Sequence, residues 1–309
     1  MPLIDVAIVG GGPAGLSAAL MLGRCRRRAV VIDAGEQRNR LAHEIHGFLT
    51  RDRVTPAEFI RLARADVARY PTIELRAGHV RRVEGARGAF RACLADGTEV
   101  ASRRVLLATG VVDVVPEIAG LRERFGRSVH HCPHCDAFEY TGRPVAVYGQ
   151  GSVGVEAALA MRTWSDRVTL LTDGTELTTE ERGACVRQHV AVRTERVLGL
   201  AGDDGGLERV ELAGGDPVAA AGLFLATGQR ERSPIAAELG CDFTPEGTVV
   251  VDRHEVTRVP GVYVAGDAAN GEQLVIVAAA EGVVAATKIH ASLSAEDLAA
   301  AGPAARPAG

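Results

Sequence analysis

Two cysteines separated by two residues, Cys132 and Cys135, are the side chains of this sequence best suited to redox chemistry. Cysteines at this spacing can close a small, reversible disulfide, and nearby positive charge favours the thiolate form of one of them. Three histidines lie beside the pair in the chain, at His130, His131 and His134. A protonated imidazole would stabilise a thiolate and make the disulfide a stronger oxidant. Asp136 follows directly, so we predict that Asp136, or else His131, moves a proton to or from sulfur.

A zinc site and a thioredoxin-type active site are the two alternative interpretations of the C-x-x-C. A tetrahedral zinc ion needs ligands beyond two cysteines, and the sequence has no second C-x-x-C. The glycine-rich patterns around the pair do not fit a thioredoxin fold. The other cysteines stand singly, as expected of small buried apolar residues: Cys25, Cys93, Cys185 and Cys241. We therefore predict no metal site.

The start of the chain has the pattern of a strand, a glycine turn, a helix and a second strand. Its segments are Asp5–Val9, the turn Gly10-x-Gly12-x-x-Gly15, a helix over Leu16–Leu22, the apolar run Ala29–Ile32 and the acid Asp33. In such a turn the first glycine permits the bend, the second admits a pyrophosphate and the third lets helix and strand pack closely. The helix N-terminus then faces the phosphates, and an acid after the second strand can bind a ribose hydroxyl. This pattern predicts dinucleotide binding.

A second unit of the same kind follows the cysteine pair. Its segments are Pro144–Tyr148, the turn Gly149-x-Gly151-x-x-Gly154, a helix ending near Arg162, the strand Val168–Leu171 and the acid Asp173. NADPH binding usually requires Arg or Lys after the second strand, where this chain has Thr172-Asp173-Gly174. Asp173 could therefore favour NADH, or repel the 2′-phosphate of NADPH. The third possibility is a Rossmann-like domain that keeps the fold without the ligand.

Three further segments complete the expected architecture. Two apolar strands end in Ala-Thr-Gly, at 105–110 and 223–228, and a third ends at Gly266-Asp267. We predict an α/β protein of two three-layer, Rossmann-like nucleotide-binding domains, the second inserted into the first. The first domain would comprise residues 1–113 and 229–309, and the insert, residues 114–228, would carry the C-x-x-C. The Ala-, Pro- and Gly-rich tail from about Ser294 has little to bury and is expected to fray.

Length and composition agree with a two-domain enzyme of the cytoplasm. The chain has 309 residues, 47% of them hydrophobic, and a formal net charge of −4. This balance does not suggest a nucleic-acid partner or an anionic membrane surface. The basic run Arg26-Arg27-Arg28 fits a solvated helix end. The apolar stretch Leu16–Leu22 is too short to span a membrane, and we expect no membrane partner.

Over nearly its whole length the sequence resembles the low-molecular-weight thioredoxin reductases. The motifs that carry the resemblance are Gly10–Gly15 with Asp33, Ala108–Gly110, Cys132–Asp136, Gly149–Gly154, Thr257–Asp267 and Glu272–Leu274. The resemblance implies a two-domain homodimer with FAD in the first domain. It implies that Cys135 faces the flavin while Cys132 exchanges with substrate. The residues it implies for FAD binding are Gly10, Gly12, Pro13, Ala14, Gly15, Asp33, Gln37, Arg40, His46, Val80, Ala108, Thr109, Gly110, Gly266, Asp267, Gln273 and Leu274.

The sequence departs from these reductases after the second Rossmann strand. Reductases of the family carry a basic H-R-R-x-x-x-R pattern there, where this chain has Leu171–Gly174. The segments 33–40 and 46–52, together with the C-P-H-C centre, instead resemble a subgroup. That subgroup contains the dithiol oxidases that close disulfides in natural products such as holomycin and gliotoxin. Asp136 matches the reductases, since several of the oxidases have histidine at that place.

The leading hypothesis is therefore an FAD-dependent dithiol oxidase. A small dithiol, or a protein dithiol, would be oxidised by the Cys132–Cys135 disulfide, with O2 accepting the electrons through FAD and forming H2O2. The alternative is a reductase in which NADH or NADPH, or a protein donor such as ferredoxin, drives reduction of a thioredoxin-like protein. A third hypothesis is a redox-sensing flavoprotein without turnover.

Overall fold

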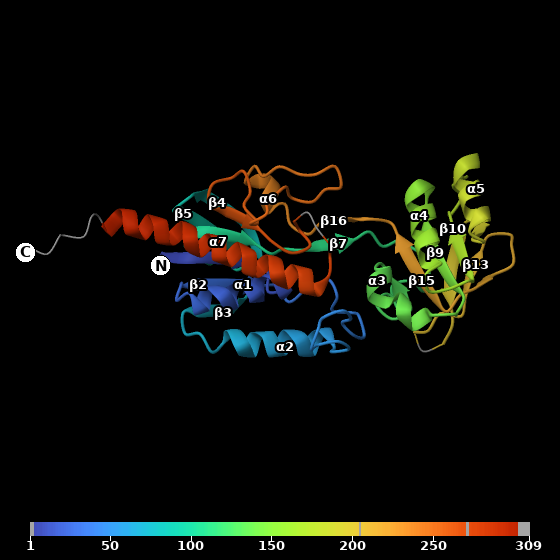
Figure 1. Cartoon of the computed structure of the whole chain (residues 1–309), viewed down its shortest axis with the longest axis horizontal. Coiled ribbons are helices and arrows are strands. Elements are labelled where there is room, and N and C mark those ends of the chain that lie inside the picture. Colours follow the sequence, from blue (N-terminus) through green and yellow to red (C-terminus); the bar gives the residue numbers. More distant parts are fainter. Residues whose placement is uncertain (1–2, 204, 270–271, 302–309) are drawn as a thin grey trace, which may run out of the picture. The chain divides into compact units, whose positions relative to one another are not determined.

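The computed structural model describes residues 3–203, 205–269 and 272–301. They form two compact units (Figure 1), of which the first comprises Met1–Arg38, Ala57–Val112 and Glu231–Gly309 and the second Asn39–Pro56 and Asp113–Arg230. The chain crosses between the units at four points, and two of them lie in the short strands β7 (Val111–Asp113) and β16 (Gln229–Glu231). The segment Asn39–Pro56, which the sequence placed within the first domain, groups with the second unit.

The first unit is built on a parallel sheet that continues into an antiparallel hairpin. Its parallel strands are β1 (Ile4–Val9), β2 (Ala29–Asp33), β3 (Ile73–Ala77), β6 (Glu99–Leu107) and β17 (Val262–Val264). The hairpin strands are β4 (Val80–Ala86) and β5 (Ala89–Leu94), in the order β3-β2-β1-β6-β5-β4, and β17 also pairs with β6. β6 therefore pairs with β1 along one edge and with two strands along the other, where residues 99–102 pair with β5 and residues 105–107 pair with β17.

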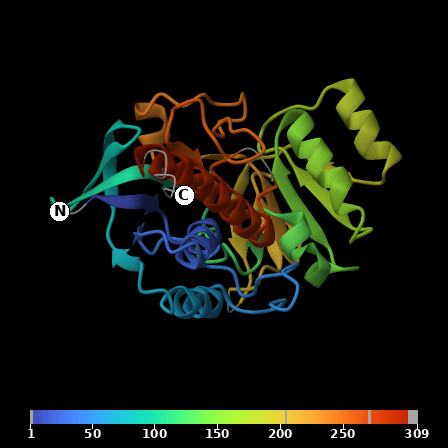
Figure 2. The same cartoon turned by 60° about the vertical axis from the view of Figure 1, so that its left-hand side comes forward.

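Alternating side chains of the sheet separate two apolar cores. On one face, Val6 and Ile8 pack among the helices α1 (Pro13–Arg24), α2 (Pro56–Val67) and α7 (Val275–Ala301). On the other face, Ala7 and Val9 pack with the hairpin and the short helix α6 (Ile235–Glu238). Figures 1 and 2 show α1 and α7 side by side. They are close enough that a Cβ on Gly282 would lie 2.0 Å from the Ala14 carbonyl oxygen.

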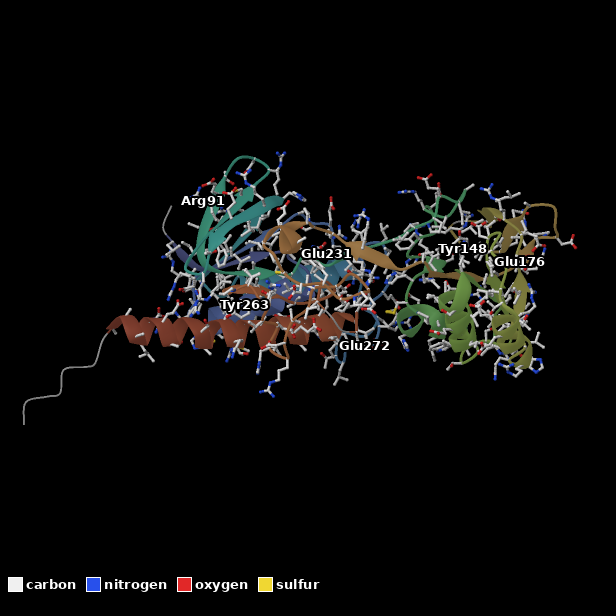
Figure 3. The ribbon with its side chains drawn as sticks, turned by 90° about the horizontal axis from the view of Figure 1, so that it is seen from above. Arg91, Tyr148, Glu176, Glu231, Tyr263 and Glu272 are labelled. Atoms are coloured by element: carbon white, nitrogen blue, oxygen red, sulfur yellow. A yellow bond between two sulfur atoms is a disulfide. The ribbon has the colours of Figure 1, made fainter. Side chains whose placement is uncertain are left out.

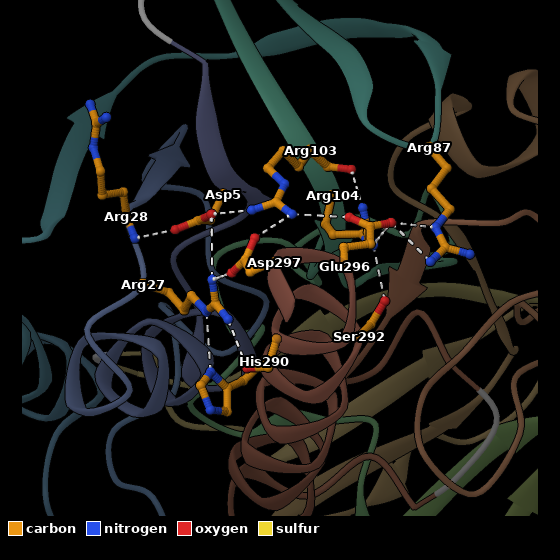
Figure 4. A network of polar contacts seen from close by, with 11 residues as sticks. Asp5, Arg27, Arg28, Arg87, Arg103, Arg104, His290, Ser292, Glu296 and Asp297 are labelled. Carbon is orange, nitrogen blue, oxygen red and sulfur yellow. Dashed lines mark hydrogen bonds and ion pairs between the residues drawn. The ribbon is translucent and has the colours of Figure 1, made fainter. Parts of the chain in front are cut away.

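The end of α7 corrects the expectation of a frayed tail after Ser294. The helix continues to Ala301, and the side chain of Leu293 is fully buried. Glu296 and Asp297 form ion pairs with arginines of the sheet and of the α1–β2 turn (Figure 4). Composition hid these contacts because the partners are distant in sequence. Residues 302–309 of the expected tail lie outside the described residues.

α7 also has the length and apolar composition of a membrane-spanning helix, and within the described residues no other helix does. Such a pattern is weak evidence for a membrane, because the core helix of a soluble domain has it too. Here Ala285, Ala286 and Ile289 are fully buried in the core that α7 shares with α1. The pattern therefore reflects packing against a neighbouring helix.

The second unit repeats the layered arrangement. Its parallel sheet has the order β11-β10-β9-β15-β8, with β8 (Val129–His130), β9 (Val145–Gly149), β10 (Val168–Leu171), β11 (Ala191–Arg193) and β15 (Gly222–Ala226). One face packs on α4 (Gly151–Met161) and α5 (Thr179–Arg187), and the other on antiparallel strands β12 (Val197–Ala201), β13 (Arg209–Leu212) and β14 (Val218–Ala219). The predicted fold class of two three-layer Rossmann-like units is confirmed.

Candidate active site

The cysteine pair lies at the start of a one-turn helix in the second unit. Cys132 and Cys135 form a disulfide with their Cα atoms 5.3 Å apart. Cys132 is the N-cap of α3 (Pro133–Asp136), whose first residue is a proline, a residue suited to that position because it lacks an N–H. The backbone N–H of Cys135 donates to Cys132 Sγ at 3.1 Å. Both cysteines are partly exposed, as thiol–disulfide exchange requires.

Asp136 is held by His130, the last residue of β8. His130 Nδ1 lies 3.3 Å from Asp136 Oδ1, and His130 Nε2 lies 2.9 Å from the hydroxyl oxygen of Tyr140. Tyr140 ends the 3-10 helix η1 (Ala137–Tyr140), and its hydroxyl donates to the Arg127 carbonyl at 3.1 Å. Burial, and secondarily the charge of Asp136, raise the pKa of Tyr140 to about 12, so its hydroxyl keeps its proton at neutral pH. The sequence identified Asp136 but gave His130 no role beyond flanking the pair.

The other two histidines have different surroundings. His131 Nδ1 lies 3.7 Å from Asp113 Oδ2, and its ring stacks against Phe125 with the centroids 6.3 Å apart. His134 is exposed, and its ring meets Trp164 edge-on. The structure thus places His130, and not His131, against Asp136. His131 remains a predicted acid–base candidate.

The first glycine-rich turn, in the first unit, has the geometry of a phosphate cradle. Gly10 has φ +110°, and a Cβ there would lie 2.1 Å from the Ala108 carbonyl oxygen. A Cβ on Gly15 would lie 2.0 Å from the Gly10 carbonyl oxygen, so both positions require glycine to pack. A Cβ on Gly12 would meet no protein atom within 4 Å. Gly12 is also the N-cap of α1 and provides no side-chain cap, so a phosphate can approach and accept hydrogen bonds from the backbone N–H groups of the first turn.

Asp33, at the end of β2, lies at the centre of a set of hydrogen-bond donors. Its carboxylate accepts from the backbone N–H of Gly11 at 3.2 Å and from that of Gly35 at 3.1 Å. Gln37 Nε2 donates to it at 3.1 Å, and the guanidinium of Arg64 on α2 forms an ion pair with it. Asp33 therefore bonds to the turn itself, and Arg64 is a partner that the sequence did not indicate.

The loop after β17 lies in the same unit. Arg38 donates to Asp267 Oδ2 at 2.9 Å and to Gln273 Oε1 at 2.6 Å. The backbone N–H of Gly266, which has φ +79°, donates to Glu281 Oε2 on α7 at 2.7 Å. These bonds hold the two ends of the loop, residues 266–267 and 273, to fixed elements of the first unit.

A second buried acid lies next to Glu281. Glu255 is 8% exposed, and burial together with the charges of Glu281 and Asp252 raises its pKa to about 7. Burial, and then the charge of Asp267, also raise the pKa of Glu281. The Gly266 loop is therefore backed by two carboxyl groups that disfavour each other's ionisation.

The remaining residues predicted to bind cofactor fall into two groups. The first group lies in the first unit: Pro13 opens α1, Ala14 is buried, Val80 begins β4, Ala108, Thr109 and Gly110 follow β6, and Leu274 precedes α7. The second group, Arg40 and His46, belongs to the second unit. There His46 Nε2 lies 3.8 Å from Glu44 and 3.7 Å from Glu139.

The second glycine-rich turn has the same glycine spacing and different surroundings. Gly149 and Gly154 are in close contact, since a Cβ on Gly149 would lie 2.8 Å from the Gly154 Cα atom. A Cβ on Gly151 would have open space except for Glu181 Oε1 at 3.9 Å. Asp173, after β10, accepts from the Tyr148 hydroxyl at 2.6 Å and from the Val197 backbone N–H at 2.8 Å. Figure 3 labels Tyr148 at the second unit.

The family is decided by a match over most of the chain. The model of the pyridine nucleotide-disulphide oxidoreductase family matches residues 4–282. This chain belongs to that family. A pyridine nucleotide-disulphide oxidoreductase of this type is an FAD enzyme that acts on disulfides or dithiols, which agrees with the disulfide of Cys132 and Cys135.

Individual relatives cover nearly the whole oxidoreductase. Thioredoxin reductase tcpT of Claviceps purpurea is 34% identical over 88% of this chain and 88% of its own. Thioredoxin reductase aclD of Aspergillus oryzae is 31% identical over 95% and 97%. The crystal structure of HlmI superposes with a TM-score of 0.92 at 38% identity, covering 97% of this chain and 95% of HlmI. A longer relative, a probable thioredoxin reductase of Arthroderma benhamiae, is matched over 45% of its length.

The residues of the first unit fit FAD. The open position at Gly12 leaves room for a pyrophosphate at the N-terminus of α1, and Asp33 stands where an acid can bind a ribose hydroxyl. Gly266 and Asp267 complete the site that the family resemblance implies. When bound, FAD would supply a two-electron carrier that exchanges electrons with the cysteine pair.

Proposed function

We propose that this oxidoreductase is an FAD-dependent dithiol oxidase. It would oxidise a small-molecule dithiol of the natural-product type to a disulfide through Cys132 and Cys135, with O2 as the final acceptor and H2O2 as the second product. We expect it to act in the cytoplasm as a homodimer. The observation that carries the proposal is the state of the second glycine-rich turn, where acids occupy the positions that would face a nicotinamide dinucleotide.

Two carboxylates, those of Glu181 and Asp173, lie at the second glycine-rich turn. Glu181 Oε1 lies 3.9 Å from the Cβ position of Gly151, at the place where the pyrophosphate would approach α4. Asp173 accepts from the Tyr148 hydroxyl with one carboxylate oxygen and from the Val197 backbone N–H with the other. Arg193 is engaged by Glu195 through bonds of 2.6 to 3.1 Å. Negative charge here opposes a dinucleotide phosphate.

The chemistry of the pair can be written from the residues present. A thiolate of the substrate attacks Cys132 Sγ, the Cys132–Cys135 bond breaks, and its electron pair leaves on Cys135 Sγ. The second substrate sulfur attacks the first, which releases Cys132 Sγ and closes the product disulfide. The pair then holds two electrons. Overall, one dithiol and one O2 give one disulfide and one H2O2.

A disulfide reductase driven by NADH or NADPH is the second candidate. It is supported by the second turn itself, which has the glycine spacing of the first and lies between β9 and α4. The printed names of tcpT and aclD, both thioredoxin reductases, also support it. In this candidate the same cysteines would reduce a thioredoxin-like protein.

One spectroscopic titration separates the two candidates. The anaerobic holoenzyme is titrated with NADPH, NADH or dithiothreitol in separate cuvettes while the flavin absorbance is followed. Air is then readmitted to each cuvette. The oxidase proposal expects bleaching by dithiothreitol alone, followed by recovery of the absorbance in air with stoichiometric H2O2. Rapid bleaching by either nucleotide would contradict it, as would recovery without peroxide.

Matched cysteine variants tie the result to the pair. Cys132→Ser should abolish bleaching by dithiothreitol, because no disulfide remains to be attacked. Cys25→Ser removes a thiol at the C-cap of α1 and should bleach as the parent enzyme does. Equal bleaching by the Cys132→Ser variant would show direct reduction of flavin by free thiol and would remove the pair from the mechanism.

A further inference from the structure

The Tyr140 hydroxyl has two hydrogen-bond contacts but only one proton to donate. The hydroxyl has a single proton and two neighbouring acceptors, the Arg127 carbonyl at 3.1 Å and His130 Nε2 at 2.9 Å. A carbonyl oxygen can only accept. When the hydroxyl donates to Arg127, His130 Nε2 must therefore donate to Tyr140. When the hydroxyl turns to His130, Nε2 must accept.

Each position of the hydroxyl fixes the protons between His130 and Asp136. If Nε2 accepts, a neutral imidazole carries its proton on Nδ1, which lies 3.3 Å from the Asp136 carboxylate oxygen and faces its negative charge. If Nε2 donates, a neutral imidazole would face the carboxylate with a bare Nδ1, and two acceptors would repel. One additional proton, on His130 or on Asp136, resolves the conflict. Rotation of one hydroxyl thus lets the pair accept one proton while His130 Nε2 keeps its hydrogen bond to Tyr140.

We propose that His130 is the positioning residue of the redox centre, and that the His130–Asp136 pair stores the proton exchanged with sulfur while Tyr140 switches between its two acceptors. This inference rests on the proposed thiol–disulfide chemistry. It makes Asp136, which directly follows Cys135 in the chain, the proton carrier and His130 the group that sets its protonation. It assigns no proton to His131, whose acidic neighbour is Asp113.

The proton balance of substrate oxidation uses one such site. The first substrate thiol gives its proton to the pair as its sulfur attacks Cys132 Sγ, and Cys135 Sγ leaves as a thiolate. The second thiol closes the product disulfide, and its proton goes to the departing Cys132 Sγ. Two protons leave the substrate, one resides on the pair and one on Cys132, and Cys135 stays anionic for electron transfer.

The surroundings favour storage within the pair over loss from Tyr140. His130 is 6% exposed and packs against the rings of Tyr140 and Phe224. Arg143 lies over the Tyr140 ring with its guanidinium carbon 5.5 Å from the ring centroid, and its charge lowers the pKa of Tyr140. Burial and the charges of Asp136 and Glu139 act in the opposite direction and prevail. Tyr140 therefore stays a phenol and acts by rotation.

The test compares His130→Gln with His131→Gln in the holoenzyme. Glutamine keeps hydrogen-bonding groups at the site but cannot hold an extra proton. The rate of anaerobic flavin bleaching by dithiothreitol is measured by stopped flow from pH 5.5 to 9.5. In the parent enzyme, the plot of bleaching rate against pH should show the ionisation of the His130–Asp136 pair in addition to that of dithiothreitol. His130→Gln should lose this feature and fall by about 100-fold at pH 7, whereas His131→Gln should keep it. Loss of the feature in His131→Gln alone would overturn the proposal.

A second measurement does not depend on turnover. The protein is labelled with carbon-13 at histidine Cε1, and the His130 signal is identified as the one missing from the His130→Gln spectrum. We expect its pH titration to move in Asp136→Asn and in Tyr140→Phe. A titration unchanged in both variants would overturn the proton-sharing pair even if the enzyme is an oxidase. Failure of dithiothreitol to bleach the parent enzyme, with the histidine shifts present, would instead contradict the proposed function alone.

Discussion

The two glycine-rich turns of this oxidoreductase share their glycine spacing and differ in their surroundings. In the first, the acid Asp33 bonds to the turn through Gly11 and is neutralised by Arg64, and Gly12 faces open space. In the second, Asp173 bonds to Tyr148 and Val197, and Glu181 faces Gly151. Each turn follows a parallel strand and opens a helix. A motif that records only glycine spacing describes both equally.

The difference shows that a Rossmann-like unit can keep its fold whether or not it keeps a ligand site. Gly149 and Gly154 are required for close packing of α4 on the sheet, so they would persist without a nucleotide. Gly12 has no such packing role, because no protein atom lies within 4 Å of its Cβ position. Gly151 is nearly as open, since only Glu181 Oε1 lies within 4 Å of its Cβ position, so the Glu181 carboxylate is what distinguishes it from Gly12.

The largest expected effect comes from filling the open position. Gly12→Val places its side chain where the protein has no atoms, at a φ of −79° that valine tolerates. We expect the protein to fold but to lose FAD, with affinity reduced by about 100-fold or more. Flavin absorbance per protein after purification, together with circular dichroism, measures both outcomes.

The matched substitution in the second turn is Gly151→Asn. Asparagine tolerates the left-handed conformation at φ +55°, so the strain should stay small. Flavin content and dithiothreitol oxidation should remain at the parent level. A loss of flavin in both variants, or in neither, would remove the distinction between the turns.

An intermediate effect is expected from neutralising the acids. Asp33→Asn leaves Arg64 without its carboxylate and weakens the bond to Gly11, so FAD should dissociate about tenfold more readily. Asp173→Asn keeps an oxygen for Tyr148 and should leave flavin retention unchanged. Fluorescence of released flavin during dilution gives the dissociation constants. Equal weakening by the two variants would mean that the second acid also supports the cofactor.

The remaining effect is on stability and concerns the acid pair behind Gly266. Glu255 has a pKa raised to about 7, so the folded state binds its proton more tightly than the unfolded state does. Stability should therefore be full below the ordinary carboxyl pKa and fall as the pH rises towards 7. Glu255→Gln removes this loss and should stabilise the protein at pH 8 by on the order of 2 kcal/mol. Melting temperatures from pH 5 to 8 measure it.

The control for that prediction is Glu246→Gln, a change at an exposed acid. It should leave the pH dependence of the melting temperature as in the parent protein. If Glu255→Gln instead lowers the melting temperature at pH 8, Glu255 is stabilising as a carboxylate. The acid pair would then need a cationic partner.

The sequence predicted the elements whose signal is local. The strand over 168–171 was placed with the bounds it has in the structure, because a short apolar run between turns defines it. The first helix, expected over 16–22, begins at Pro13 and ends at Arg24. The N-terminal proline and the small residues after it already belong to the helix, which a search for apolar periodicity overlooks.

Contacts between distant residues could not be predicted in this way. Tyr148 and Asp173 lie 25 positions apart, and the bond between them decides how the second acid is used. His130 and Asp136 are close in sequence, but it is the turn from β8 into α3 that brings their side chains to 3.3 Å. The chemistry of the C-x-x-C was visible in the sequence, whereas the partner of its acid required the fold.

The last turn of α7 sets how far the chain can be shortened from its carboxyl end. Arg104 is fully buried, and its guanidinium is neutralised by Glu296 and bonded to Ser292. Glu296 also pairs with Arg103, and the pKa of its carboxyl is lowered to about 2 by these arginines. Removal of the residues after 291 would leave the buried Arg104 guanidinium without its counter-ion. Such a change typically lowers the free energy of unfolding by about 3–5 kcal/mol. An affinity tag should therefore be added beyond Ala301, leaving this alanine-rich end intact.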